Sequence, residues 1–362
     1  MGEAFVWRSP AGNWLGMNQS APRGQPQRVE RYAGLTLPPQ IELTHVTVPR
    51  FSQESQDLIV GRPAPLWGVS MGVNYGGVAG SVIRAGKPGR LERFSPLLKE
   101  DLLRLALMQA HSAKAAVGVV TAYLERFGEI RGRTVAPAVY VFADAGSLWL
   151  LETEGNLWWA QPVGHMEAVV GAPAWPGDAV LKALNARPEN RRPKLALETD
   201  ARRATLLKGL AHVINHHETG HFTPVADILR GDVMGHWEQQ EGAVCRHGRL
   251  WQRETANSML VHLEVGKAPR LWFTGSSRPC ISLFKPVQWD AEPWFHRHVH
   301  FWENWRHAIR LAQRWPAVRE RLITLHRELE NQWQNLLQED VNVLIRLEQW
   351  WNAVNQVLKM AR

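Results

Sequence analysis

The chain has 362 residues, a formal net charge of +8 and only two cysteines. This length allows one large or two medium domains with a sizeable core, and two cysteines exclude the disulfide framework that many small secreted proteins carry. The 42 basic residues are scattered among 34 acidic ones without a block of like charge, so we expect no nucleic-acid partner.

In chain order, residues 1–90 alternate short apolar runs with turns, which predicts strands. Two helices are predicted next, over 95–110 and 112–128, followed by three strands, and then helices around 199–230. The strands expected after residue 128 lie over 138–145, 147–153, 156–163, 258–265, 270–275 and 280–286. Because strands and helices each come in runs, the order is typical of α+β layers and not of a doubly wound parallel sheet.

The sequence HHETGH at 216–221 contains H-E-x-x-H, in which two histidines on one helix face bind zinc and the glutamate acts as general base. Apolar residues at helical spacing over 206–214 predict a helix that reaches this point. Gly220 lies inside the motif, and we expect Thr223 to be the N-cap and Pro224 the first residue of a new helix. Because the motif straddles a helix end, we expect no metal site.

From about residue 291 the sequence becomes helical and rich in tryptophan, since 291–362 contains seven of the 18 tryptophans. The HRHVH segment at 296–300 is interpreted as helical, which spreads its histidines around the axis and predicts no metal site. Apolar residues recur at three- to four-residue steps over 316–359, which predicts an amphipathic helix, or two that meet near Glu339-Asp340. This stripe is expected to dock on the main domain or to form a dimer seam. We therefore divide the chain into domains 1–290 and 291–362.

Five segments, in order, carry a family resemblance. They are GRPAPLWGVSMGVNYGGVAG (61–80), the two helices ending YLERFG (123–128), FADAGSLWLLETEGNLWWA (142–160), VCRHG with TANSM (244–259) and FTGSSRPCISLFKP (273–286). Together they resemble the secernin and dipeptidase family of N-terminal-nucleophile (Ntn) hydrolases over roughly residues 2–290. The resemblance implies a four-layer αββα sandwich, here followed by a helical C-terminal extension. It also implies an amide hydrolase whose first mature residue, a cysteine, attacks the carbonyl while its own α-amino group serves as base.

At the catalytic positions the chain departs from the family's pattern. The family's C-D-T-F-V-A strand matches 2–7, so Gly2 stands where the nucleophilic cysteine would be, and glycine has no attacking group. The family's G-K-N-S-D-R-P matches 16–22, where Met17, Ser20 and Ala21 replace the lysine, the aspartate and the arginine.

Two asparagines remain as candidate oxyanion or pocket residues. Asn18 is retained within 16–22, and Asn74 matches the asparagine that the family's M-G-x-N-E-x-G-V aims at the developing oxyanion. A turn residue between paired strands is the alternative role for Asn74. The family's N-x-S-N element should follow Val163, where this chain has no asparagine.

These departures lead us to expect a secernin-like pseudoenzyme that has lost amide hydrolysis and has a binding or assembly role, without metal or cofactor. The alternative is an active dipeptidase or amidohydrolase with a relocated nucleophile at Ser9, Cys245 or Cys280. Expected partners are a small peptide or amide ligand, and a second copy or another protein on the C-terminal helices. No apolar run approaches membrane-spanning length and the start lacks a signal-peptide pattern, so we expect a cytoplasmic protein without a membrane partner.

Overall fold

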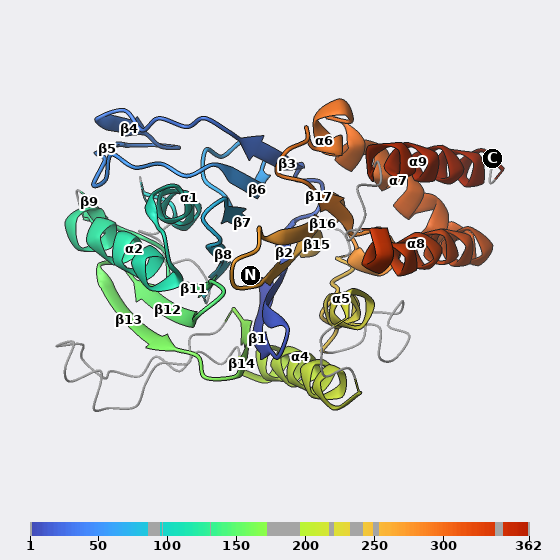
Figure 1. The fold of residues 1–362 in the computed structure, drawn as a ribbon, viewed down its shortest axis with the longest axis horizontal. Coiled ribbons are helices and arrows are strands. Elements are labelled where there is room, and N and C mark those ends of the chain that lie inside the picture. The colour runs from blue at the N-terminus through green and yellow to red at the C-terminus, as the bar shows by residue number, and fades with distance from the viewer. Residues whose placement is uncertain are drawn as a thin grey trace.

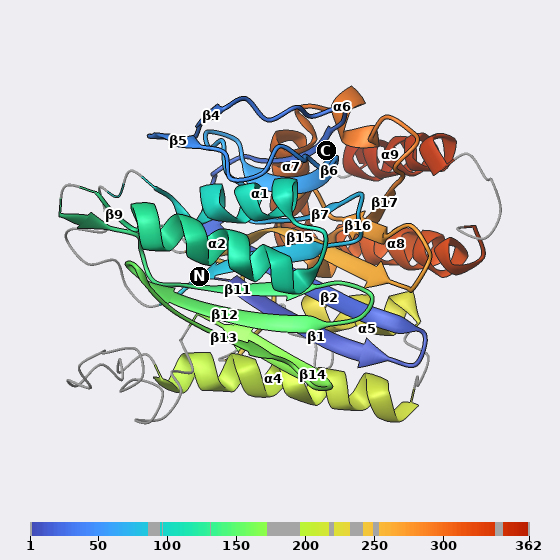
Figure 2. The ribbon, with the colours of Figure 1, turned by 60° about the vertical axis from the view of Figure 1, so that its left-hand side comes forward.

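Two large antiparallel sheets form the centre of the molecule (Figures 1 and 2). The computed structural model describes residues 2–85, 95, 97–130, 132–171, 196–216, 221–231, 242–248, 253–336 and 343–360. The two sheets pack face to face, and helices cover the outer face of each. The α+β fold expected from the sequence, a four-layer αββα sandwich followed by C-terminal helices, is therefore confirmed.

The first sheet, sheet A, has the strand order β14-β1-β2-β15-β16-β17. Its strands span Gly2–Ser9 (β1), Gly12–Pro22 (β2), Met166–Val170 (β14), Arg253–Leu263 (β15), Arg270–Phe273 (β16) and Lys285–Val287 (β17). Gly12, in the β1–β2 hairpin, has a φ of +139°, and a Cβ there would lie 2.5 Å from the carbonyl oxygen of Leu263. Glycine is therefore required where this hairpin packs against the end of β15.

The second sheet, sheet B, has the order β13-β12-β11-β8-β7-β6-β3. Its strands span Gln27–Tyr32 (β3), Leu58–Pro63 (β6), Met71–Asn74 (β7), Ala79–Arg84 (β8), Ala138–Ala143 (β11), Leu148–Glu154 (β12) and Leu157–Pro162 (β13). Two short hairpins lie outside the large sheets and pair Gln40–Glu42 (β4) with Thr47–Pro49 (β5), and Glu129–Ile130 (β9) with Arg133–Thr134 (β10). Strands β3 and β6 lie within residues 1–90, where strands were expected, whereas β14 was not predicted.

Helices α1 (Lys99–Gln109) and α2 (Ala113–Phe127) cover sheet B, whereas α4 (Ala196–His216) and α5 (Phe222–Arg230) cover sheet A (Figure 2). The expected start of α5 was wrong, because His221 is its N-cap and the helix begins at Phe222. Pro224 is then the third helical residue. It is tolerated there because the N–H groups of the first turn have no partner within the helix.

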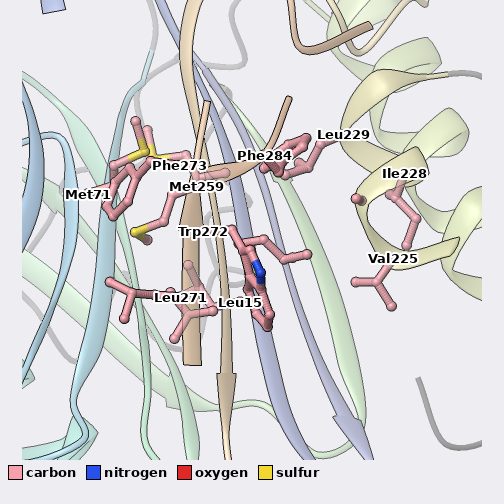
Figure 3. Packing of buried hydrophobic residues seen from close by; sticks show 14 of the residues in the cluster. Leu15, Met71, Val225, Ile228, Leu229, Met259, Leu271, Trp272, Phe273 and Phe284 are labelled. Atoms are coloured by element: carbon pink, nitrogen blue, oxygen red, sulfur yellow. The ribbon is translucent and has the colours of Figure 1, made fainter. Parts of the chain in front are cut away.

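The core between the layers is formed by side chains that alternate along the strands. In Figure 3, Met259 and Phe273 extend from sheet A toward Met71 of sheet B. The neighbouring Trp272 points to the opposite face, where its ring lies 4.8 Å from that of Phe222 on α5. Alternation along a strand thus lets one strand contribute both to the interior between the sheets and to the interface with the helices.

The C-terminal helices pack on the sandwich beside η3, the 3-10 helix Pro279–Ile281 (Figure 1). They are Trp294–Arg297 (α6), Phe301–Arg314 (α7), Pro316–Leu336 (α8) and Val343–Met360 (α9). The apolar stripe predicted over 316–359 is buried within the chain at Val318, Leu322, Val343, Leu347, Trp350, Val354 and Val357. Of the two alternatives for this stripe, docking on the main domain and a dimer seam, the structure has the docked arrangement. The buried cluster runs without a break from the sandwich into these helices, across position 290.

The strand expected over 280–286 was wrong for most of its length, because only its end belongs to β17 and its start lies in η3. Pro279 has no N–H to donate to a strand ladder and fixes its own φ, which favours a short helical turn. The residue before it, Arg278, has a φ of +62°. The chain therefore turns sharply into η3 and places Cys280 beside His247, in the segment 242–248.

Candidate functional site

Gly2, at the position that the resemblance assigns to the nucleophile, is buried at the start of β1. A Cβ at Gly2 would lie 2.8 Å from the backbone oxygen of Asn18 and 3.5 Å from Cε of Met17. Real Cβ atoms essentially never approach another atom within 3.0 Å, and here the obstructing atom belongs to the backbone. That backbone is paired with β1 on one side and β15 on the other, so it resists displacement. A cysteine side chain would fit at this position only if the start of β1 or this part of β2 shifted.

The replaced positions Met17, Ser20 and Ala21 all lie on β2 and are buried. Met17 is the side chain nearest to the place a residue-2 side chain would occupy. Ser20 and Ala21 pair with Thr255 and Glu254 on β15. The site that the resemblance implies is therefore occupied by the methionine side chain and by sheet backbone.

Asn18 lies on β2 and joins three segments through its side chain. Its Nδ2 donates to the carbonyl oxygens of Leu229 at 2.7 Å and Val244 at 3.2 Å, and its Oδ1 accepts from the hydroxyl of Ser258 at 2.6 Å. Both amide hydrogens are thus donated to backbone carbonyls at the end of α5 and in the segment 242–248. Asn18 fixes those segments on sheet A.

Asn74 lies at the end of β7, and its side chain joins the β7–β8 turn to helix α1. Its Nδ2 donates to the carbonyl oxygens of Leu107 at 2.9 Å and Ala110 at 2.7 Å, and its Oδ1 accepts from the backbone N–H of Val78 at 2.8 Å. The two carbonyls are among those that a helix end leaves without internal partners. Asn74 therefore has the hydrogen bonds of a turn residue, which was the alternative to the role of an oxyanion donor.

The H-E-x-x-H motif lies between two helices, since α4 ends at His216 and α5 begins at Phe222. Residues 217–220, which contain most of the motif, lie outside the described residues. A helix does reach HHETGH, as the sequence predicted.

The HRHVH segment is not one helix, contrary to the sequence prediction. His296 belongs to α6, His298 follows it, and His300 precedes α7. Nε2 of His298 lies 2.8 Å from a carboxylate oxygen of Glu348 on α9, so this histidine joins α6 to α9. Because α6 ends at Arg297 and α7 begins at Phe301, the break in the expected helix falls at residues 298–300.

Sequence reasoning missed a cluster of two thiols and an imidazole. Nε2 of His247 lies 3.1 Å from Sγ of Cys280 and 3.5 Å from Sγ of Cys245, and the three atoms all lie within 4.8 Å of one another. Cys245 and His247 are buried, and Cys280 is partly buried. The C-x-H spacing at 245–247 is the signal in the sequence, but its partner Cys280 is brought to it only by the fold.

A single residue of β15, Thr255, holds both segments that carry this cluster. The backbone N–H of Arg246 donates to Oγ1 of Thr255 at 2.9 Å, and the N–H of Thr255 donates to the carbonyl of Arg246 at 3.0 Å. On the other side, the N–H of Arg278 donates to the carbonyl of Thr255 at 3.0 Å. The left-handed backbone of the buried Arg278 is unfavourable for a residue with a side chain and persists because these neighbours hold it.

Lys285 is a buried cation at the junction with the C-terminal helices. Its Nζ donates to the carbonyls of Thr274 at 2.6 Å and Leu283 at 3.1 Å, and lies 4.3 Å and 4.8 Å from the ring centroids of Phe301 and Trp350. Burial lowers the pKa of Lys285 well below its ordinary value. The carbonyls and aromatic faces bind the ammonium group and join the end of sheet A to α7 and α9.

His262, on β15, is expected to make stability depend on pH. Burial, helped by the Arg270 guanidinium, lowers the pKa of His262 to about 4 from an ordinary 6.5, and its ring stacks on Trp14 at 4.2 Å. The unfolded chain therefore binds the proton first, so this contribution is present above pH 6.5 and is lost as pH falls toward 4. The loss is on the order of 3 kcal/mol.

Urea unfolding at a series of pH values should show a smaller loss on acidification for His262→Gln than for the wild type. The wild type and the variant are compared at each pH because burial also raises the pKa of Asp101 to about 6. This second shift makes both chains more stable as pH falls, which is opposite to the effect of His262. The exposed His216 is the control, and His216→Gln should follow the wild-type profile. Parallel profiles for wild type and His262→Gln would contradict the prediction.

Comparison with known proteins gives distant similarity only. No family model matches the chain. Penicillin V acylase from Agrobacterium tumefaciens shows 11% identity over 75% of this chain and 82% of its own, with a TM-score of 0.47. The N-acylethanolamine-hydrolyzing acid amidase ortholog of Caenorhabditis elegans shows 9% identity over 74% and 94%, with a TM-score of 0.43. A mutant of conjugated bile acid hydrolase from Clostridium perfringens shows 9% identity over 75% and 88%, with a TM-score of 0.46.

Among the described helices, none combines the length and the apolar character needed to cross a membrane. The chain is an α+β protein with an αββα sandwich and a docked layer of C-terminal helices.

Proposed function

We propose that this chain is a secernin-like, Ntn-type scaffold that has lost amide hydrolysis and has a binding or assembly role. One observation carries the proposal. A Cβ at Gly2 would lie 2.8 Å from the backbone oxygen of Asn18, so the position matched to the nucleophile has no attacking group and would admit one only if the backbone shifted. Hydrolysis through an amino-terminal cysteine needs the sulfur of that residue, because the covalent intermediate forms on it.

The hydrogen bonds of the two candidate asparagines support the same proposal. Stabilising an oxyanion requires a donor aimed at the position of the developing charge. The amide hydrogens of Asn18 and Asn74 are donated to backbone carbonyls instead. Binding or assembly is the role that remains for the scaffold, with a small peptide or amide as the expected ligand class.

The test is an attempt to restore the reaction. The wild type and a Gly2→Cys variant whose amino terminus begins at residue 2 are assayed on a panel of dipeptides and acylated amines. Neither is expected to exceed the buffer blank, and Gly2→Cys should also unfold at lower urea concentration because β1 and β2 must separate to admit the side chain. Wild-type turnover that a single substitution abolishes would overturn the proposal, and so would turnover gained by Gly2→Cys.

A second candidate function is an amidohydrolase with a relocated nucleophile. The 3.1 Å contact between Sγ of Cys280 and Nε2 of His247 is the observation in its favour, because an imidazole can take the proton of an attacking thiol. An acylating probe, read by peptide mass spectrometry, tests it. Stoichiometric acylation of Cys280 that is lost in His247→Gln would establish this alternative, and an unlabelled chain would exclude it.

A further inference from the structure

The cluster of Cys245, His247 and Cys280 has the dimensions of a tetrahedral metal site. With bonds of about 2.3 Å to sulfur and about 2.0–2.1 Å to nitrogen, tetrahedral angles place a sulfur and a nitrogen ligand about 3.5 Å apart. The corresponding separations here are 3.5 Å and 3.1 Å, and all three ligand atoms lie within 4.8 Å of one another. Three donor atoms this close to one another can bind a single ion.

The ligands come from two segments that β15 already holds together. Thr255 bonds the backbone on both sides, at Arg246 and at Arg278, and Asn18 binds the carbonyl of Val244. A site built on such a framework requires little ordering when the ion binds, which favours affinity. Cys245 and Cys280 are distant in sequence, so a bound ion would crosslink the segment 242–248 to η3.

The chemistry of the donors selects the ion. Thiolate sulfur with imidazole nitrogen is the ligand set of Zn²⁺, whereas Mg²⁺ and Ca²⁺ bind oxygen. Two thiolates balance the charge of one Zn²⁺. Three protein ligands leave the fourth tetrahedral position for a water molecule or an added ligand.

The competing use of the cluster, a cysteine nucleophile with a histidine base, accounts for the geometry less well. Such a pair requires one sulfur at the basic nitrogen. In this chain both sulfurs approach the same atom, Nε2 of His247, and the second thiol therefore has no role in a two-residue catalytic pair. Three donor atoms grouped within 4.8 Å of one another are what coordination of a cation requires.

We propose that Cys245, His247 and Cys280 bind one Zn²⁺ ion through Sγ, Nε2 and Sγ. Binding replaces the thiol protons of the two cysteines, which pass to the solvent, and no oxidation or reduction is involved. The ion holds the segment 242–248 on η3, next to the interface with α8. This proposal does not depend on the loss of hydrolysis at Gly2, but it excludes Cys280 as a relocated nucleophile.

The test uses the reduced, full-length chain stripped of metal with a chelator and titrated with Co²⁺. One equivalent is expected to produce the thiolate-to-cobalt charge-transfer band and intense visible bands of tetrahedral cobalt, and one equivalent of Zn²⁺ should remove them. Cys245→Ser and Cys280→Ser should each lose or strongly reduce the charge-transfer band, and His247→Gln should weaken Co²⁺ binding by at least about 10-fold. Far-ultraviolet circular dichroism in chelator checks that each variant is folded.

The control is His217→Gln/His221→Gln, which removes the H-E-x-x-H histidines and should bind Co²⁺ as the wild type does. If the serine variants do not fold, alkylation of the wild type decides instead, since Zn²⁺ should protect both cysteines together. The proposal is overturned if the reduced wild type gives no charge-transfer band, if a folded serine variant keeps the full band, or if the histidine control loses it. Alkylation of both cysteines that is as fast with Zn²⁺ as without it would also overturn the proposal.

Discussion

Replacing Arg230 with methionine is expected to destabilise the folded chain by about 3–5 kcal/mol. Arg230 lies at the end of α5, is 3% exposed, and its guanidinium lies 2.5 Å from the carboxylate of Glu330 on α8. Glu330 is fully buried and also accepts the backbone N–H of Phe284 at 3.0 Å. The substitution removes the guanidinium partner of that buried carboxylate, at the contact between the sandwich and the C-terminal helices.

Urea unfolding at pH 7 measures this effect, and two variants make it specific. Arg327→Met removes the more exposed ion pair with Asp227 on the same surface and should cost less than about 1 kcal/mol. Arg230→Met/Glu330→Leu replaces both members of the buried pair and should be more stable than Arg230→Met, because the carboxylate that lost its guanidinium partner is then removed as well. Equal losses for Arg230→Met and Arg327→Met would contradict the prediction.

Replacing Trp305 with alanine is expected to destabilise the chain by about 3–5 kcal/mol. Trp305 lies on α7 and is 0% exposed. Its ring centroid lies 5.7 Å from that of Phe301, 6.0 Å from that of Trp350 and 5.8 Å from that of His326. The large side chain thus fills the space between α7, α8 and α9, and its removal leaves a cavity that these helices cannot close.

The matched control is Trp315→Ala, because Trp315 is 46% exposed at the end of the same helix and should cost less than about 1 kcal/mol. Urea unfolding followed by tryptophan fluorescence and by circular dichroism should give one coincident transition for Trp305→Ala. The reason is that the buried cluster is continuous between the sandwich and the C-terminal helices. Separate transitions, with the sandwich unfolding as in the wild type, would show instead that the helices form an independent unit.

The candidate site was predictable from the sequence only in part. The absence of a nucleophile at Gly2 is visible in the sequence, given the resemblance. The contact between that position and the backbone oxygen of Asn18 depends on how β1 pairs with β2. For Asn74, the sequence left a turn residue and an oxyanion donor as alternatives. The bonds to Leu107 and Ala110 depend on where α1 ends in space.

The sequence by itself determined the layers of the protein, because apolar periodicity depends on residues that are neighbours along the chain. Runs of alternating residues became the sheets, and three- to four-residue spacing over 316–359 became the buried faces of α8 and α9. Only the tertiary structure decided which polar side chains meet. Cys280 reaches His247, and Arg230 reaches Glu330, through contacts between segments far apart in sequence. Such contacts are fixed by strand order and helix docking, which local pattern does not specify.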